Sequence, residues 1–436
     1  MTNIKKKSHL NLILVTTMSL ILYYSEAIQF ITGINGTQFI DDILYLIILS
    51  WVPWLLFTNK KWDRTLSRNT TISLIIILTG IVSHLASGYI SYERLALGFI
   101  YFSKPFVFVI WGALMSQRIN RKDKEKIFKI IIVVSTITVF ISLIDLFFPR
   151  ILSSYFPSMF LYGEKRISAL WGHPGKAAFY LSIGIICFSI SFLYTHKFRY
   201  IILVLVSLYL TYHTYMKKTF LAIAAEYHYL IFAFIKNRTK KLFVLLAISL
   251  LFFLFLFETK LGERFFSEYK FVLTDIYEDR SRILMFLSTI DLLASSSFYF
   301  LFGAGFGNWL GYATSIYYSP LHYNFFLDMY YGLNHIDGSY LGDNYFAHII
   351  GEVGSFGATL IALFFISSLI YLLKKTSRYD PVQVLGTCLF INGCVHTIGF
   401  SLPEITSMSY FSFALPMILV LNINNDEVAN NDQKSN

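Results

Sequence analysis

The chain has 436 residues, of which 56% are hydrophobic and only 14% are charged, and its formal net charge is +10. This composition, with a mean hydropathy of +0.58, excludes an ordinary soluble domain and is typical of a polytopic membrane protein. The positive charge does not indicate a nucleic-acid partner, because the basic residues gather at the ends of apolar segments. The positions of the three cysteines indicate neither a disulfide nor a metal site.

Apolar windows long enough to cross a bilayer, about 17–25 residues, follow one another along most of the chain. Twelve are expected, at residues 10–34, 39–57, 70–88, 95–115, 128–148, 174–195, 199–215, 219–235, 242–257, 345–373, 382–400 and 406–423. We therefore predict an all-α polytopic membrane protein with about 12 transmembrane helices. Its parts are an N-terminal bundle of about nine helices (1–257), a large outer loop with short interfacial helices (258–344), about three C-terminal helices (345–423) and a disordered tail (424–436).

The basic residues predict the orientation of these helices, because Lys and Arg concentrate in cytoplasmic connections. When the connections are counted alternately from the N-terminal lysines, every strongly basic one falls on the same side. These connections lie at 5–7, 60–68, 118–129, 197–199, 236–241 and 374–378. Both termini are therefore expected in the cytoplasm.

A second set of cations falls on the opposite side or inside the membrane, against this bias. It comprises Arg94, Lys104, Arg150, Lys165, Arg166, Lys176, Lys217, Lys218 and the cations of the large loop. An anionic ligand on the outer face would explain their position, since guanidinium and ammonium groups bind phosphate well.

Arg166 lies in a polar, turn-rich approach to the sixth predicted helix, ahead of His173 and Pro174. Pro174 suits an early helix position. The planar guanidinium of Arg166 can bind two phosphate oxygens at once. Trp171 favours the alternative, in which Arg166 is an interfacial anchor.

Lys217 and Lys218 occupy a short connection between the seventh and eighth predicted helices. At the membrane surface they would meet a lipid-linked pyrophosphate or, alternatively, ordinary lipid headgroups. Glu226 and His228 fall within the eighth predicted helix, and Lys104 falls within the fourth. Ionisable residues at such depth are costly and generally face the interior of a bundle.

The loop at 258–344 contains a glycine-rich turn (Gly303, Gly305 and Gly307) and seven tyrosines between Tyr312 and Tyr340, which suit stacking on sugar faces. It also contains Arg280 and Arg282, which open a segment of helical spacing with apolar residues at Ile283, Phe286, Leu287, Ile290 and Leu293. This helix is expected to lie on the membrane surface with its arginines at the N-terminal end. The alternative for Arg282 is a surface ion pair with Glu278, which would contribute little.

Asp343 and Asn344 immediately precede the tenth predicted helix. Either Asp343 or His335 would be the base that activates a sugar hydroxyl. Alternatively, Asp343 only caps the helix. His348 and Glu352, one turn apart on that helix, are expected to be packing or network residues.

Four motifs occur in order along residues 160–370. They are Arg166 with Gly172-His-Pro, Lys218-Thr-Phe-Leu-Ala, Arg282 with Leu-Phe-Gly303-Ala-Gly305-Phe-Gly307-Asn308, and Asp343-Asn344-Tyr345 with Glu352-Val-Gly354-Ser-Phe-Gly357. In this order they resemble the O-antigen polymerase and O-antigen ligase superfamily. Arg166 and Arg282 match arginines of the family. Lys218 stands where many members have an arginine, and Asp343 stands where a histidine commonly precedes the asparagine.

The resemblance implies a glycosyltransferase of the bacterial inner membrane, acting at its outer face on undecaprenyl-pyrophosphate-linked oligosaccharides without a cofactor, metal or nucleotide sugar. The expected catalytic residues are Asp343, His335 and Arg282, and the expected substrate-binding residues are Arg166, His173, Lys217, Lys218, Arg280 and Asn344. A polymerase of O-antigen or capsular repeat units is the first expectation, with membrane lipids and a chain-length regulator protein as further partners. The alternatives are an O-antigen ligase that acts on a lipid A-core acceptor and a transporter of lipid-linked sugars. A transporter would show two related halves, which this sequence lacks.

Overall fold

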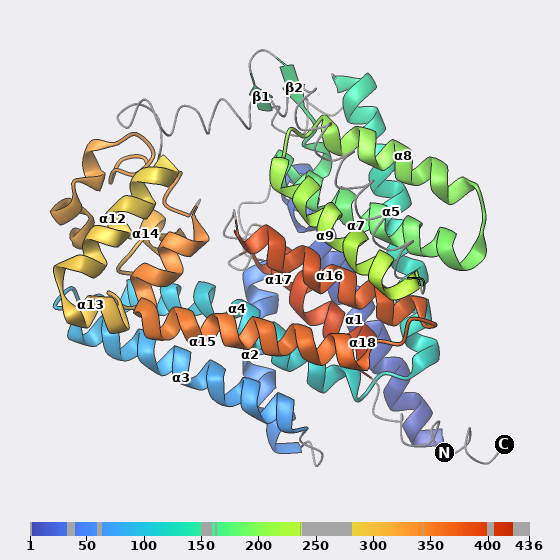
Figure 1. Ribbon diagram of the computed structural model, residues 1–436, viewed down its shortest axis with the longest axis horizontal. Coiled ribbons are helices and arrows are strands. Elements are labelled where there is room, and N and C mark those ends of the chain that lie inside the picture. The colour runs from blue at the N-terminus through green and yellow to red at the C-terminus, as the bar shows by residue number, and fades with distance from the viewer. Residues whose placement is uncertain are drawn as a thin grey trace.

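The computed structural model of the chain describes residues 2–32, 40–58, 63–149, 159–161, 164–235, 237, 281–342, 344–398 and 405–421. These residues are almost entirely helical (Figure 1). The helices are α1 (Thr2–Thr32), α2 (Ile40–Thr58), α3 (Arg64–Ala86), α4 (Tyr92–Ser116), α5 (Arg121–Phe147), α7 (Pro174–Thr195), α8 (Arg199–Tyr212), α9 (Lys217–Phe234), α12 (Ser281–Ser295), α13 (Ser297–Phe302), α14 (Gly311–Ile316), α15 (Tyr345–Lys375), α16 (Pro381–Ile398), α17 (Thr406–Ser409) and α18 (Leu415–Val420). Short 3₁₀ turns lie at Ala169–Trp171, Pro320–Phe325 and Leu327–Met329, and a π-turn at Tyr410–Ala414 joins α17 to α18.

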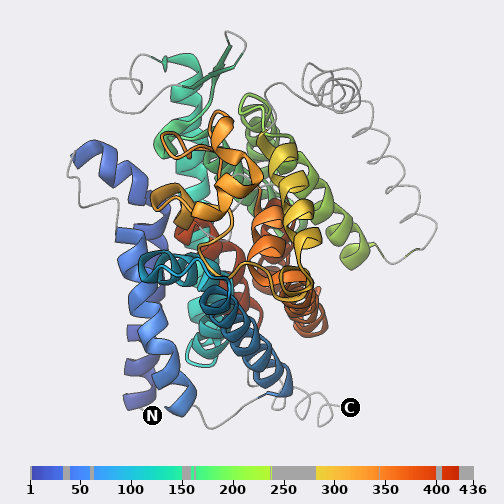
Figure 2. The ribbon, with the colours of Figure 1, turned by 90° about the vertical axis from the view of Figure 1, so that its left-hand side faces the viewer.

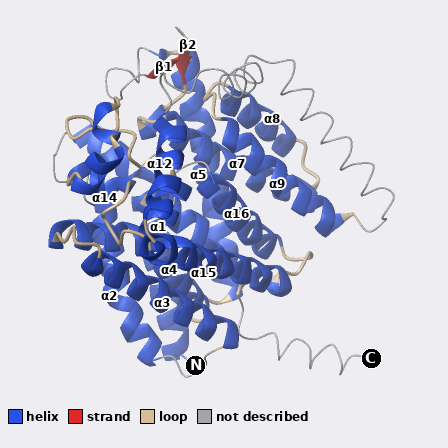
Figure 3. Ribbon diagram, turned by 60° about the vertical axis from the view of Figure 1, so that its left-hand side comes forward, coloured by secondary structure: helices blue, strands red, loops and turns tan. Residues whose placement is uncertain are grey.

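The β structure of the described residues consists of a two-stranded hairpin. Strand β1 (Met159–Leu161) pairs antiparallel with β2 (Glu164–Arg166), and Met159 lies opposite Arg166. The hairpin and the start of α1 lie at opposite ends of the molecule in all three overall views (Figures 1, 2 and 3).

Six helices are long and apolar enough to cross a membrane, namely α2, α3, α4, α5, α7 and α15. They confirm six of the predicted windows. Helix α1, helix α8 and the 406–420 segment contain shorter apolar stretches, and α9 and α16 are 18 residues long. The window at 242–257 and the tail at 424–436 lie outside the described residues.

Helix α3 shows why these helices suit a membrane. Its buried face carries polar side chains, with Asn69, Ser73, Ser83 and His84 among them. Its exposed face carries Leu74, Leu78, Val82 and Leu85, spaced along one stripe. A helix in water buries its apolar face. This reversed pattern therefore indicates an apolar surrounding, in which polar groups are best placed against protein.

The helix ends that were predicted to share the cytoplasmic side do contact one another. Arg118, after α4, accepts a hydrogen bond from Asn11 of α1 at 3.3 Å and donates one to Thr58 at the end of α2 at 3.2 Å. Arg121 of α5 lies 3.7 Å from Asp380, which precedes α16. The connections that follow α4 and α15 and the end of α2 therefore lie at one end of the bundle. Which compartment this end faces stays a prediction.

The described part of the large loop, 281–342, is folded and has a hydrophobic core of its own. This core contains Met285, Leu292, Ala304, Trp309, Leu310, Leu321, Leu327, Leu333 and Leu341, with Ala347 from α15. Two of its buried side chains form hydrogen bonds inside the loop. Trp309 Nε1 donates to Thr289 Oγ1 at 2.8 Å, and His322 Nε2 accepts from the amide of Leu310 at 3.1 Å.

The loop docks on the bundle through its glycine-rich turn. Gly303, Gly305 and Gly307 all have positive φ, and a Cβ on each would lie 2.0–2.4 Å from backbone atoms of α15, α3 and α4, respectively. The amides of the turn also donate hydrogen bonds to the bundle. The amides of Ala304 and Gly305 donate to carbonyls of α15 at 2.7 and 2.8 Å, and that of Phe306 donates to an α3 carbonyl at 3.2 Å. These glycines therefore serve helix–loop packing, and their amides do not form a phosphate cradle.

Helix α12 confirms the predicted helical spacing after Arg282. Met285 and Leu292 face the core of the loop, whereas Phe286, Leu287 and Ile290 are 42–47% exposed. The apolar stripe that the spacing indicated is thus on the outer surface of the protein, where an interfacial helix would meet lipid.

Candidate functional site

The predicted cations Arg166, Lys217 and Lys218 lie around the N-terminus of α9. This helix begins after Met216, whose side chain cannot accept hydrogen bonds from the first amides as a polar cap would. Arg166, at the end of β2, donates from Nε to the carbonyl of Thr214 at 2.9 Å and from Nη2 to the sulfur of Met216 at 2.9 Å. The positive end of the helix dipole therefore coincides with three cationic side chains, which is a favourable place for an anion.

The segment that carries Arg166 is held by Asp145, near the end of α5. Its Oδ1 accepts from Lys165 Nζ at 2.5 Å, and its Oδ2 accepts from the amides of Ser168 and Ala169 at 3.1 and 2.8 Å. The amide of Ile167 donates to the carbonyl of His213 at 3.2 Å, which ties the segment to the end of α8. The carboxylate thus holds the side chain of Lys165 and the backbone that follows Arg166.

The start of α7 lies beside this group. Pro174 occupies the first turn of α7 as predicted, and His173 is its N-cap, with Nδ1 accepting from the amide of Gly175 at 3.0 Å. Trp171 is buried, donates to the carbonyl of Tyr23 at 3.1 Å and stacks on Tyr180. Because Trp171 faces protein, it gives no support to the interfacial-anchor alternative for Arg166.

A second charged group joins α2, α4 and α17. Lys104, whose side chain is only 1% exposed, donates from Nζ to Asp42 Oδ1 at 2.8 Å. Thr406 donates to the same oxygen at 3.1 Å. The ammonium also lies over the rings of Tyr101 and Tyr45, at 4.3 and 5.7 Å from their centroids. The expectation that Lys104 faces the bundle interior is confirmed.

Two longer-range electrostatic interactions involve residues near these charged groups. The charge of Lys176, in the first turn of α7, acts on the Asp41 carboxylate of α2, and the charge of Lys218 acts on His396 near the end of α16. Met216 also lies against Gly175 of α7. We define the candidate site as Arg166, Lys176, Lys217, Lys218, Asp41, Asp42 and Lys104.

Asp41 and Asp42 are site residues that no motif indicated. Their signal in the sequence is the presence of two adjacent carboxylates at the edge of an apolar window, together with an intramembrane lysine on another helix. Pairing them from sequence was not possible, because Asp42 and Lys104 are separated by a whole helix and two connections.

Three of the cations that seemed to need an anionic ligand have partners within the protein. Lys104 pairs with Asp42 and Lys165 pairs with Asp145. Arg94 donates to the carbonyls of Tyr89 and Tyr318 at 2.7 and 3.2 Å, so that it joins the start of α4 to the loop. The inference from charge placement to an external anion is therefore wrong for Arg94, Lys104 and Lys165.

The loop residues of the predicted site are not seen to join the cations at the start of α9. Asp343 and Arg280 lie outside the described residues, and Arg282 is described only as the second residue of α12. His335 is exposed, and its described ring contacts are with Tyr318 and Tyr323, inside the loop. In Figure 1, the loop helices α12 and α14 lie to one side of the molecule and α8 and α9 to the other.

Asn344 has a structural role in the described part of the chain. It is the N-cap of α15, with Oδ1 accepting from the amide of Ala347 at 3.2 Å. The alternative that gave the cap to Asp343 is therefore wrong by one residue, and the assignment of Asn344 to substrate binding stays a prediction.

His348 and Glu352 form the network that was predicted. His348 Nε2 lies 2.9 Å from Glu352 Oε2, and Glu352 Oε1 accepts from the amide of Gly307 at 2.5 Å. The pair therefore anchors the glycine-rich turn to α15.

Glu226 of α9 faces the bundle interior, as expected for an ionisable residue at that depth. Asn392 of α16 donates to Glu226 Oε1 at 3.1 Å and to Ser182 of α7 at 2.9 Å. His228 instead bonds the carbonyl of Ala224 in its own helix. The Asn392 amide thus links three helices about two turns beyond Lys218.

Comparison of the chain with models of known protein families and with curated proteins finds no match. The resemblance to the O-antigen polymerase and ligase superfamily therefore rests on the four motifs and their order. Among the described residues, no group of His, Cys, Asp and Glu is placed to hold a metal ion.

Proposed function

We propose that this protein is a membrane glycosyltransferase that polymerises undecaprenyl-pyrophosphate-linked repeat units into O-antigen or capsular polysaccharide at the outer face of the bacterial inner membrane. The observation that carries the proposal is the arrangement of Arg166, Lys217 and Lys218 around the N-terminus of α9. Arg166 ends the β1–β2 hairpin, which lies at the opposite end of the molecule from the start of α1 (Figure 1). The order of the four motifs supports it, as does the presence of a folded loop beside the bundle.

The chemistry requires few groups. The bond between the donor sugar and the pyrophosphate breaks, and the pyrophosphate leaves with the electron pair. A hydroxyl oxygen of the acceptor forms the new glycosidic bond, and its proton passes to a base. Cations that stabilise the charge on the leaving pyrophosphate would supply much of the catalysis. Arg166, Lys217 and Lys218 suit this role, and the role of Arg282 on α12 stays a prediction from the family motif.

Two carboxylates are candidates for the base. Asp343 is favoured by the position of the family motif, and Asp42 is favoured by its ion pair with the buried Lys104. The side chain of Asp42 is 28% exposed, and Oδ1 is the oxygen that accepts from both Lys104 and Thr406. Lys104 and Thr406 therefore orient a carboxylate that is not sealed from substrate.

The deciding experiment is deletion of the gene in its native host, followed by analysis of the surface glycan. Loss of a polymerase leaves surface glycan with a single repeat unit. Complete loss of surface glycan from an intact core identifies a ligase instead. Glycan of normal length excludes both enzyme activities.

Orientation has a separate test. Single cysteines introduced at Tyr330 and at Lys122 should react with a membrane-impermeant reagent from the outside and from the cytoplasm, respectively. Labelling of position 330 from the cytoplasm would refute the proposed orientation.

A further inference from the structure

Two buried polar side chains near the start of α9 have no hydrogen-bond partner among the described residues. Thr219, in the first turn of α9, is 0% exposed, and its hydroxyl oxygen is not bonded. His396, near the end of α16, is 1% exposed, and neither of its ring nitrogens is bonded. Because a buried polar group without a partner destabilises a fold, these atoms indicate a place that a ligand completes.

Both side chains face the seam between α9 and α16. Asn392 of α16 donates to Glu226 of α9 at 3.1 Å, and this bond identifies the facing sides of the two helices. Thr219 lies two turns before Glu226 on the same side of α9, and His396 lies one turn beyond Asn392 on the same side of α16. The charge of Lys218 acts on His396. The unpartnered side chains therefore lie between the Asn392–Glu226 bond and the start of α9.

Helix α7 holds the ring of His396 from another side. Phe179 packs edge-on against this ring, with 5.5 Å between the ring centroids. Phe179 lies three residues beyond Lys176, and Gly175 lies against Met216, which precedes α9. His396 is therefore close to the starts of both α7 and α9, where the cations of the candidate site are carried.

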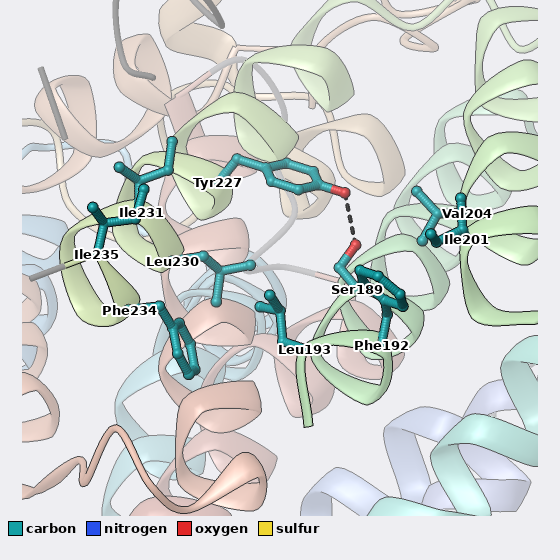
Figure 4. Close-up of a pocket in the computed structure, with 10 residues that line it drawn as sticks. All are labelled: Ser189, Phe192, Leu193, Ile201, Val204, Tyr227, Leu230, Ile231, Phe234 and Ile235. Carbon is teal, nitrogen blue, oxygen red and sulfur yellow. Dashed lines mark hydrogen bonds between the residues drawn. The ribbon is translucent and has the colours of Figure 1, made fainter. Parts of the chain in front are cut away.

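Deeper in α7 and α9, a second pair of hydroxyl groups is fully bonded. Ser189 donates its hydroxyl proton to the carbonyl of Ile185 at 2.8 Å, which leaves its oxygen to accept from Tyr227 OH at 2.6 Å. Figure 4 shows these two hydroxyl groups pointing towards one another beside an apolar groove. Tyr227 thus provides a reference on α9 for a hydroxyl group that has its partner within the protein.

The groups at the start of α9 select a ligand that accepts hydrogen bonds. The Thr219 hydroxyl can donate, His396 carries an N–H on whichever ring nitrogen is protonated, and the ammonium of Lys218 is a donor only. The first amides of α9 also point out of the helix, and Met216 gives them no polar cap. An ionised phosphate oxygen can accept from all of these groups, and the charge of Lys218 and the helix dipole both favour it.

We propose that His396 and Thr219 bind a phosphate oxygen of the lipid-linked donor at the start of α9. His396 lies beyond residues 160–370, so the family resemblance does not mark it. This inference rests on the proposed function for the identity of the anion. Lys218 attracts the phosphate as a point charge. The two directional donors would fix which oxygen lies at the helix start, and so would orient the leaving group.

The test measures equilibrium binding of geranyl pyrophosphate, a short and soluble polyprenyl pyrophosphate, to the purified full-length protein. Thr219→Val and His396→Phe should each weaken binding about tenfold or more, because each removes a donor to a charged group. Neither variant should lower the melting temperature, because neither removes a hydrogen bond within the protein. Thr219→Ser keeps the hydroxyl and should bind as the wild type does.

Tyr227→Phe is the matched control, because it removes a hydroxyl of α9 that has a partner. Tyr227 lies eight residues beyond Thr219, which is about 12 Å along the helix axis. This variant should lower the melting temperature and leave the affinity for geranyl pyrophosphate unchanged. Stability and affinity should therefore change in opposite ways in the control and in the two site variants.

The other outcomes overturn the inference. Wild-type affinity in either Thr219→Val or His396→Phe would remove that residue from the site, and an equal loss of affinity in Tyr227→Phe would show a general effect of altered packing. Equal affinity for glycerophosphoglycerol, the head group of phosphatidylglycerol, would make this an ordinary lipid head-group site. Weakened binding in both site variants, in a protein whose deletion leaves glycan length unchanged, would keep the phosphate site and refute the polymerase.

Discussion

The attachment of the large loop to the bundle gives the sharpest structural prediction, through Gly305. Its φ is +85°, and a Cβ would lie 2.0 Å from the amide nitrogen of His84 and 2.2 Å from its Cα. These atoms belong to the backbone of α3, so they cannot yield as a flexible side chain would. In Gly305→Ala, the turn must therefore retreat from α3 by about 1 Å.

The retreat would break most of the hydrogen bonds that dock the turn. Four amides, those of residues 304–307, donate to α15 and α3 over 2.5–3.2 Å. Each contributes roughly 1 kcal/mol, and the left-handed backbone costs alanine about 1–2 kcal/mol. Together these effects should lower the free energy of local opening of the loop by about 4–6 kcal/mol. Gly88 is the matched control, because its φ is +79° but a Cβ there meets nothing within 4 Å. Gly88→Ala should cost only the backbone strain, about 1–2 kcal/mol.

Chymotrypsin cleavage between Tyr312 and Tyr340 in purified full-length protein measures this opening. When reclosing is faster than cleavage, the rate follows the open population. Gly305→Ala should then be cleaved about 10³-fold faster than wild type or reach the rate of a fully open loop, and Gly88→Ala about tenfold faster. Equal rates for the two variants would refute the docking role of the turn.

The remaining predictions concern the charged groups. Arg166→Ala should abolish chain extension while the amount of protein in the membrane stays normal, since loss of one donor to a developing charge typically costs about 10²–10³ in rate. Arg166→Lys should restore chain extension poorly. A wild-type glycan ladder from both variants would contradict a role of Arg166 in pyrophosphate binding. Asp42→Asn should lower the amount of protein in the membrane, because removing one partner of a buried ion pair costs about 3–5 kcal/mol of stability. If Asp42 is the base, the double variant Asp42→Asn with Lys104→Met should restore the amount of protein but not the activity. Burial, with the charge of Arg94, lowers the pKa of His322 to about 3. The folded loop thus keeps this ring neutral while the unfolded chain protonates it below about pH 6.5, so resistance to an acid-active protease should fall from pH 6.5 towards 3 and be flatter in His322→Gln.

Several features could be predicted from the sequence because they depend on local properties. Windows of high hydropathy identify the six long apolar helices, since the bilayer sets a length of about 20 residues. Pro174 indicates the start of α7 and the spacing of His348 and Glu352 indicates a pair on one helix, because both follow from helix geometry.

The composition of the site was decided by tertiary structure. The local pattern marked Arg94, Lys104 and Lys165 as unexplained cations, and only the folded structure supplied Tyr318, Asp42 and Asp145 as their partners. Likewise, three glycines in a loop are compatible with a phosphate cradle until the backbones of α3, α4 and α15 are in place against them. The physical reason is the same in both cases. Hydropathy and helix capping depend on residues that are close together in the sequence. The partner of a buried charge or amide depends instead on which groups the folded bundle brings within about 3 Å of it.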